Sequence, residues 1–147
     1  MSEYRRLLDS NVCSKDIRRY KKLLIFGTCL KDEHPEIVAE WSKGRATFHV
    51  CLESEHVNMV GFKLASILCR VPIEEIVILT VDGSLHCVQL HMMAEEVNRF
   101  FGNRFKIRHL VYEKGKVIEI DPEVVKTARF LTKVRSLLAL KHKGTSS

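Results

Sequence analysis

Short apolar runs that alternate with amphipathic stretches constrain the fold of this 147-residue chain more than any other feature. Residues 23–26 (LLIF) form an uninterrupted apolar run that ends at Gly27, and residues 76–81 (IVILTV) form another. Runs of this length without polar alternation are typical of strands that are buried on both faces. Residues 47–52 (TFHVCL) predict a further strand between them in the chain. Such strands need helices above and below the sheet.

The segments between the strands predict those helices. Pro35 suits the first position of a short helix. A long helix is expected over about residues 54–69, because Pro72 prevents it from continuing, and another over residues 85–101. Strands that alternate with helices of this length imply right-handed crossovers and a parallel sheet.

The last part of the chain predicts a hairpin and a final helix. Residues 105–112 and 117–120 have strand composition on either side of a turn, which predicts a β-hairpin at an antiparallel edge of the sheet. Asp121 then suits the cap of a C-terminal helix over residues 122–142. The apolar stripe of this helix, which we expect to pack on the sheet, consists of Val124, Ala128, Leu131, Val134 and Leu138.

Together these elements predict a single α/β domain over residues 1–147, arranged in three α/β/α layers. The sheet is expected to be mostly parallel, with about five strands in a flavodoxin-like or Rossmann-like arrangement. Residues 1–20 are expected to form a basic helical segment, and residues 143–147 a disordered tail.

The net charge of +6 is concentrated at the two ends of the chain. Residues 1–22 contain seven Lys or Arg against three Asp or Glu, and residues 123–147 contain six against one. A basic surface made by the two terminal segments would attract nucleic acid or another polyanion. Two solvated helices without such a partner are the simpler interpretation, because no recognition motif accompanies the charge.

Composition also bears on the cellular location. No apolar run approaches the roughly 20 residues of a transmembrane helix, and residues 1–20 are too charged for a signal peptide. The five cysteines are an odd number and include no CxxC pair, so reduced thiols are the default. We therefore expect a cytoplasmic protein that does not enter a membrane.

The residues that follow the first three strands carry the candidate chemistry. In an open parallel sheet, ligands bind at the carboxyl ends of the strands, beside the point where the strand order reverses. Asn58 is a further ligand-binding candidate, because asparagine is a weak helix former inside a predicted helix. The strand-end residues are Thr28 and Cys29 after the first strand, Cys51 at the end of the second, and Asp82, Gly83, Ser84, His86 and Cys87 after the third.

The turn after the third strand gives the most specific hypothesis. A Gly-containing turn into a helix presents backbone N–H groups to an anion. If Ser84 is the N-cap, Cys87 is the third helical residue, where the helix dipole and the imidazoles of His86 and His91 favour the thiolate. Cys87 and His86 are therefore candidate catalytic residues. The candidate ligands for a metal ion or an iron–sulfur cluster are Cys29, Cys51, Cys87 and His86.

Cys87 also has a purely structural interpretation. It follows the same helical spacing as Leu90, Ala94 and Val97, so it can be an unreactive core residue. His86 lies beside this apolar face and is more commonly a hydrogen-bonded core histidine. His91 is expected at the surface.

A second apolar strip on the same helix, formed by Leu85, Val88 and Met92, lies away from the first. A helix exposed to water on that side would not normally have such a strip. We therefore predict a homo-oligomer that associates through the Leu85, Val88 and Met92 face.

Two functions from different classes remain open. The first is a small thiol-based or metal-binding protein, an accessory to redox or iron–sulfur chemistry. The second is a non-catalytic homo-oligomeric assembly or polyanion-binding protein whose cysteines are structural. No G-x-G-x-x-G follows the first strand and no P-loop motif occurs, which argues against the standard modes of dinucleotide and nucleotide binding.

Overall fold

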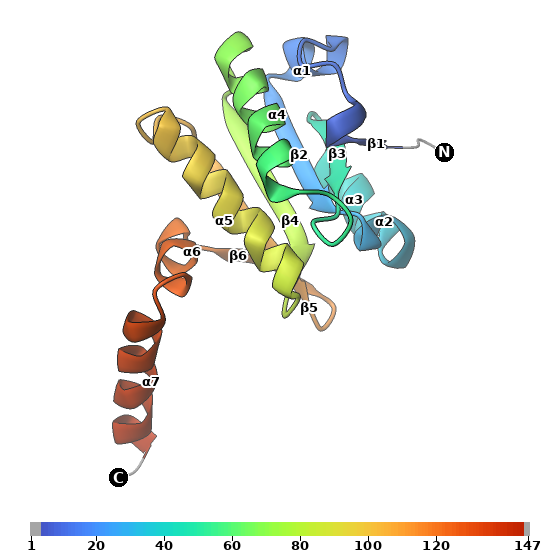
Figure 1. Cartoon of the computed structure of the whole chain (residues 1–147). Helices are drawn as coiled ribbons and strands as arrows, with labels where there is room; N and C mark the ends of the chain where they lie inside the picture. Colours follow the sequence, from blue (N-terminus) through green and yellow to red (C-terminus); the bar gives the residue numbers. More distant parts are fainter. Residues whose placement is uncertain (1–3, 146–147) are drawn as a thin grey trace.

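Six strands form one sheet in the computed structural model, which describes residues 4–145 (Figure 1). All neighbouring pairs are parallel except the last, which is an antiparallel hairpin. The order across the sheet is β1-β3-β2-β4-β5-β6. The strands are β1 (Arg5–Arg6), β2 (Lys22–Gly27), β3 (Ala46–Val50), β4 (Glu75–Val81), β5 (Ile107–Glu113) and β6 (Lys116–Ile120).

The strand order defines where a ligand site is expected. Without the two-residue β1, the order β3-β2-β4-β5-β6 is the 2-1-3-4-5 order of flavodoxin-like sheets, with an antiparallel last strand. The chain passes from β2 to β3 on one side and then crosses to β4 on the other side of β2. The order therefore reverses between β2 and β4, and the crevice beyond their carboxyl ends is the switch point. The predicted α/β fold class is confirmed.

Helices cover both faces of this sheet (Figure 1). One face is covered by η1 (Leu7–Asp9), α1 (Lys15–Tyr20), α4 (Val57–Arg70) and α5 (Leu85–Phe100), and the other by α2 (Cys29–Glu33) and α3 (Pro35–Ser42). α6 (Pro122–Ala128) packs beside α5 and β5. Among residues 4–145, no helix combines the length and the apolar composition needed to cross a membrane.

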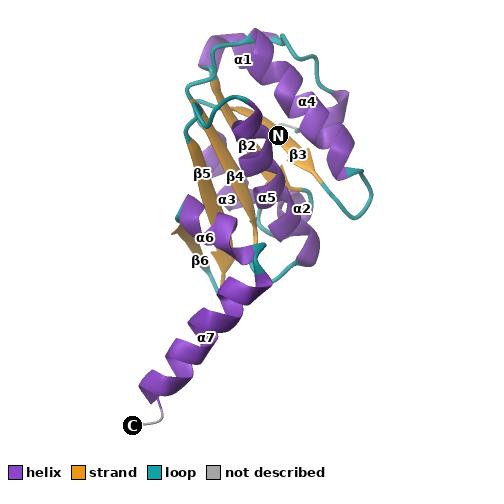
Figure 2. Cartoon of the chain, turned by 60° about the vertical axis from the view of Figure 1, so that its left-hand side comes forward, coloured by secondary structure: helices purple, strands orange, loops and turns teal. Residues whose placement is uncertain are grey.

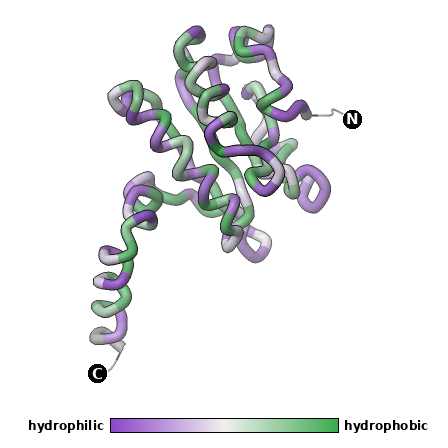
Figure 3. The backbone as a smooth tube through the Cα atoms, in the orientation of Figure 1, coloured by the Kyte–Doolittle hydropathy of each residue, from purple (hydrophilic) through white to green (hydrophobic). Residues whose placement is uncertain are grey.

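Side chains that alternate along the central strands build the two halves of the core. Leu23 and Ile25 of β2 are fully buried on the α4 and α5 face, whereas Leu24 and Phe26 are fully buried on the α2 and α3 face. The central strands are accordingly the most hydrophobic part of the backbone tube (Figure 3). A strand buried on both faces explains the unbroken apolar runs in the sequence.

The N-terminal segment differs from the predicted basic helix over residues 1–20. Arg5 and Arg6 form the edge strand β1, which pairs in parallel with β3, and the α-helix of this segment is limited to Lys15–Tyr20. Ser14 caps α1 by accepting a hydrogen bond from the N–H of Ile17. Residues 1–3 lie outside the described part of the chain.

The C-terminal region differs from the predicted single helix packed on the sheet. The helix over residues 122–142 is interrupted after α6, and α7 (Leu131–Thr145) leads away from the body of the molecule (Figure 2). Of the apolar residues in α6, Val125 is the buried one, whereas Val124 is exposed. The predicted tail over residues 143–147 overlaps α7 up to Thr145, and residues 146–147 lie outside the described residues.

Candidate functional site

A pocket of about 120 Å³ lies where β2, β3 and β4 end. Its walls come from three separate connections between a strand and the next helix. Six of the nine strand-end and helix residues predicted from the sequence line it, namely Thr28, Cys29, Cys51, Ser84, His86 and Cys87. The pocket therefore brings together three cysteines that are far apart in the chain, at the point where the strand order reverses.

The turn into α5 has the predicted geometry. Gly83 has a φ of +89°, a backbone conformation that side chains other than glycine rarely adopt. Ser84 is the N-cap of α5, and its Oγ accepts a hydrogen bond from the N–H of Cys87 at 3.4 Å. Cys87 is thus the third residue of a 16-residue helix, at the positive end of the helix dipole.

The sulfur of Cys87 lies against the end of β2. A Cβ atom built on Gly27 would be 3.6 Å from Cys87 Sγ, which is ordinary van der Waals contact. Cys87 is half-buried, whereas Leu90, Ala94 and Val97 on the same helical face are buried. Cys87 therefore lies at the end of the core stripe, where the core opens into the pocket.

Cys29 is the first residue of α2, is exposed, and also lines the pocket. Partial burial raises the pKa of its thiol, and nearby Cys87, Glu33 and Cys51 raise it further. Each of these effects disfavours the negatively charged thiolate. Cys29 is therefore expected to act in this pocket as a neutral thiol.

His86 is half-buried and lines the same pocket. Its ring makes no hydrogen bond to any other residue among those described, unlike the hydrogen-bonded core histidine expected from the sequence. The side chain of Thr28, by contrast, is engaged, because its Oγ1 lies 2.9 Å from Nδ1 of the buried His49. The His86 nitrogens therefore remain available to a ligand.

Three of the predicted ligand-binding residues do not line this pocket. Asp82 lines a mainly apolar hollow of about 140 Å³ between α5 and α6, Gly83 is an exposed turn residue, and Asn58 lies in the groove between α4 and α5. Within residues 4–145, no group of three or more His, Cys, Asp or Glu side chains is placed to hold a metal ion.

A buried polar chain under α5 was not predicted from the sequence. Thr80 Oγ1 lies 2.7 Å from His91 Nε2, and His91 Nδ1 lies 2.9 Å from His109 Nδ1. His109 Nε2 lies 2.6 Å from Glu95 Oε2. Lys126 of α6 extends the chain, with its Nζ 3.9 Å from Glu95 Oε1. The polar chain therefore links β4, α5, β5 and α6.

One arrangement of protons satisfies this chain with neutral imidazoles. The Thr80 hydroxyl donates to His91 Nε2, the Nδ1–H of His91 donates to His109, and the Nε2–H of His109 donates to the Glu95 carboxylate. Burial and the neighbouring His109 lower the pKa of His91 to about 3. Since all the ring nitrogens are engaged, the chain is a structural element that holds α5 on the sheet.

The prediction that His91 lies at the surface is wrong, because His91 is only 5 % exposed. The buried face of α5 is wider than the stripe from Leu90 to Val97, since β5 and α6 cover its flank. Two signals were present in the sequence. His91 and Glu95 are four residues apart on one helical face, and His109 interrupts an apolar strand.

The strand order and the pocket at the switch point define a Rossmann-like α/β protein. A family model described as a Rossmann-like domain matches residues 16–144, and the chain belongs to this family. Neither the curated proteins nor the solved structures gave a match. A shared fold does not specify chemistry, so the function depends on the side chains of this chain at the switch point.

Proposed function

We propose that the protein binds a small ligand in the switch-point pocket through its thiols, with Cys87 as the thiol that contacts the ligand. The observation that carries this proposal is that Cys29, Cys51 and Cys87 come from three different connections and line one pocket of about 120 Å³. Thiols that serve only as packing residues have no reason to gather at the position where open parallel sheets bind ligands.

The surroundings of Cys87 support a role in contacting an electrophilic ligand. The amino end of α5 provides a positive potential, and His86 lines the same pocket with free ring nitrogens. When Cys87 Sγ adds to an electrophilic, doubly bonded carbon of the ligand, the S–C bond forms, the π electron pair moves onto the ligand's heteroatom, and the thiol proton passes to the His86 imidazole. Reduced thiols require a reducing compartment, so location in the cytoplasm belongs to the same proposal.

Metal binding is a second form of this proposal. Thiolates of Cys29, Cys51 and Cys87 with the imidazole of His86 are a ligand set suited to zinc or to an iron–sulfur cluster. The raised pKa of Cys29 opposes it, because metal ligation needs the thiolate. The arrangement of the described side chains, which offers no ready group of three metal ligands, also favours the metal-free thiol form.

An assembly or polyanion-binding role is the alternative function. α7 supports it, because its Lys133, Arg135 and Lys141 are exposed on a helix that projects from the body. The two basic terminal segments lie at opposite ends of the molecule in both views, so they do not form one continuous surface (Figures 1 and 2). Polyanion binding therefore rests on α7 alone.

The proposal is tested by purifying the full chain without oxygen, measuring its metal content, and following alkylation of each cysteine by iodoacetamide at pH 7 with mass spectrometry. We expect metal-free protein in which Cys87 reacts faster than the exposed Cys13 and Cys69. His86→Gln should slow the reaction of Cys87, because it removes the proton acceptor.

The matched control is Cys69→Ser, which removes an exposed thiol outside the pocket and should leave the other rates unchanged. If the protein contains a stoichiometric metal and Cys87→Ser loses it, the pocket binds a metal, and the metal-free thiol version of the proposal is wrong. Metal-free protein in which Cys87 is the slowest of the five thiols would contradict both forms and favour the alternative.

A further inference from the structure

α7 exposes an apolar face that nothing in the structure covers. Leu131, Leu137 and Leu138 are 80 %, 56 % and 51 % exposed, and Phe130, just before the helix, is also exposed. On a helical projection these residues and the half-buried Val134 fall within an arc of about 120°, the width of a core-facing stripe. Green and purple alternate along this helix, far from the body (Figure 3).

A helix of this kind needs a partner to be stable. α7 has 15 residues, and isolated helices shorter than about 12 to 15 residues are marginal in water. In proteins, packing of the apolar face supplies most of the stability. Within residues 4–145, the only element with several contacts to α7 is the short α6. The face of α7 is therefore built to be covered by something else.

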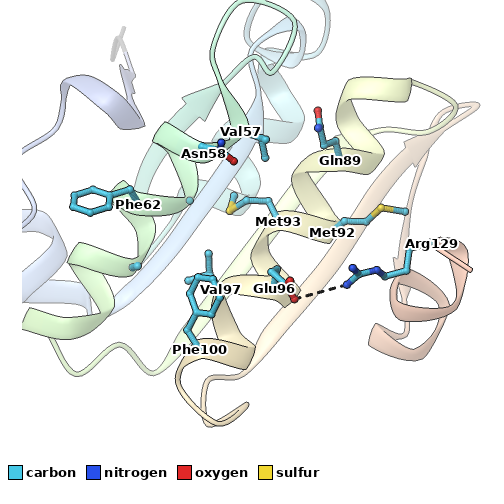
Figure 4. A pocket seen from close by; sticks show the side chains of 12 residues that line it. Val57, Asn58, Phe62, Gln89, Met92, Met93, Glu96, Val97, Phe100 and Arg129 are labelled. Atoms are coloured by element: carbon cyan, nitrogen blue, oxygen red, sulfur yellow. Dashed lines mark ion pairs between the residues drawn. The ribbon is translucent and has the colours of Figure 1, made fainter.

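The same chain has an apolar groove on its surface. It lies between α4 and α5, has a volume of about 620 Å³, and is flanked by Phe62 and Phe100, which are 76 % and 71 % exposed (Figure 4). Its floor includes Met93, Val97 and Gly61. A Cβ atom on Gly61 would lie 3.6 Å from Met93 Cγ and 3.7 Å from Val97 Cγ2, so α4 and α5 approach each other closely at this point of the groove.

α7 is long enough to fill the groove. The residues that line the groove span 57–65 in α4 and 89–100 in α5, so its walls are about 12 to 17 Å long at 1.5 Å per residue. α7, with 15 residues, is about 22 Å long. The helix can therefore fill the whole groove.

We propose that two copies of this chain exchange α7, so that the α7 of each copy lies in the groove between α4 and α5 of the other. A copy does not fill its own groove, because the connection at Arg129 and Phe130 is short and α7 leads away from it (Figures 1 and 2). Arg129 Nη1 lies 3.7 Å from Glu96 Oε1 and holds the end of α6 at the groove edge (Figure 4).

Charge complementarity favours this occupant. Glu96 is the acidic residue among those that line the groove, and its Oε1 makes no hydrogen bond. The nearest cationic nitrogens, from Arg99 and Arg129, are 3.7 Å away. α7 contains Lys133, Arg135 and Lys141 and no acidic residue, so a docked α7 adds cations beside this carboxylate.

The number of apolar faces that the exchange covers sets the area it would bury. A reciprocal exchange removes four apolar faces from water, two helices and two grooves. If each face contributes about 300 Å², the lower end for apolar patches on monomers, the total reaches roughly 1,200 Å², where stable interfaces begin.

Met92 of the predicted oligomer face lines this groove, whereas Leu85 and Val88 lie outside it.

Sedimentation equilibrium of the full chain tests the exchange. We expect the wild-type protein to be a dimer and two double variants to be monomers. The helix variant combines Leu131→Glu with Leu138→Glu, and the groove variant combines Phe62→Glu with Phe100→Glu. All four side chains are exposed, so the variants should keep the wild-type circular dichroism of the body. Thr132→Glu with Ser136→Glu, which adds the same charge on the opposite face of α7, should remain dimeric.

Mixing the two monomeric variants distinguishes exchange from other pairings. The intact α7 of the groove variant can enter the intact groove of the helix variant, so the mixture should form a heterodimer with one restored site, at least tenfold weaker than the wild type. A monomeric wild-type protein would overturn the proposal, whether α7 then turns back on its own groove or serves another partner. A groove variant that stays dimeric would also overturn it, in favour of direct pairing between two α7 helices.

Discussion

His91 Nδ1 lies 2.9 Å from His109 Nδ1, and both imidazoles are buried beneath α5. A hydrogen bond between the two facing nitrogens requires that one of them carry a proton and the other accept it. The low pKa of His91, about 3, keeps this ring neutral over the ordinary pH range. The pair therefore joins α5 to β5 through a hydrogen bond that requires one of the two Nδ1 atoms to remain unprotonated.

Stability should fall in acid because of His91. The ordinary pKa of histidine is 6.5, so between pH 6.5 and about 3 the unfolded chain binds a proton at this position that the folded protein does not bind. Stability from this group is complete above pH 6.5 and is lost as the pH falls toward 3, at up to about 1.4 kcal/mol per pH unit. Urea unfolding at several pH values measures the slope.

His91→Gln should make this slope shallower, because glutamine takes up no proton. The matched control is His56→Gln, which changes an exposed histidine and leaves the His91 chain intact, so the contribution of His91 to the slope should persist. Equal slopes for the wild type and His91→Gln would show that His91 is not the group responsible.

Asn98 should be important for stability although it lies outside the pocket. Its Nδ2 donates to the carbonyl of Phe105 at 2.9 Å, and its Oδ1 accepts from the N–H of Phe105 at 3.0 Å. Asn98→Ala leaves both backbone groups without these partners and should destabilise the protein by about 2 to 4 kcal/mol in urea unfolding. The exposed Asn58→Ala should stay within about 0.5 kcal/mol of the wild type, and similar losses for both would refute this role.

Gly27→Ala should reduce access to Cys87 without unfolding the protein. The added methyl group would lie 3.6 Å from Cys87 Sγ, in ordinary contact, and would cover part of the sulfur. Iodoacetamide should then alkylate Cys87 several times more slowly, with stability within about 1 kcal/mol of the wild type.

Gly61→Ala serves as the control, since its methyl group would make the same 3.6 Å contact with Met93 instead. It should leave the reaction of Cys87 unchanged. If Gly27→Ala reacted at the wild-type rate, Cys87 would have to present its sulfur away from β2.

Cys29 should become reactive only at higher pH than a small-molecule thiol. Burial is the main cause of its raised pKa, and Cys87 is the second. Alkylation of Cys29 as a function of pH, followed by mass spectrometry, should therefore have a midpoint above that of free cysteine. Cys87→Ser should move the midpoint down, because serine stays uncharged. A midpoint at or below that of free cysteine would contradict the partial burial of this thiol.

The parts of the fold with a strong hydrophobic pattern could be predicted from the sequence. β2 and β4 appear as unbroken apolar runs because they are buried on both faces, and the turn at Gly83 and Ser84 follows from local capping chemistry. The gathering of Cys29, Cys51 and Cys87 followed from the parallel topology alone. β1 could not be predicted, because two arginines at a sheet edge have no pattern and are ordered only by pairing with β3.

The partners of side chains were harder to predict than the elements. The apolar stripe of α7 was recognised, but a stripe indicates only that a face needs cover and does not identify the element that covers it. His91 was misplaced for a related reason. A helical projection gives its angle on α5, whereas its burial depends on α6, which lies beside α5 and contributes Lys126 to the polar chain.

The most direct test of the thiol pocket is whether its cysteines obstruct one another. N-ethylmaleimide is attached to Cys87 alone, and the rates at which iodoacetamide then reaches the other four cysteines are compared with those in the unmodified protein. The adduct should fill the pocket of about 120 Å³, so Cys29 and Cys51 should react several times more slowly while Cys13 and Cys69 keep their rates. Unchanged rates at Cys29 and Cys51 would contradict a shared pocket, and with it the proposed site.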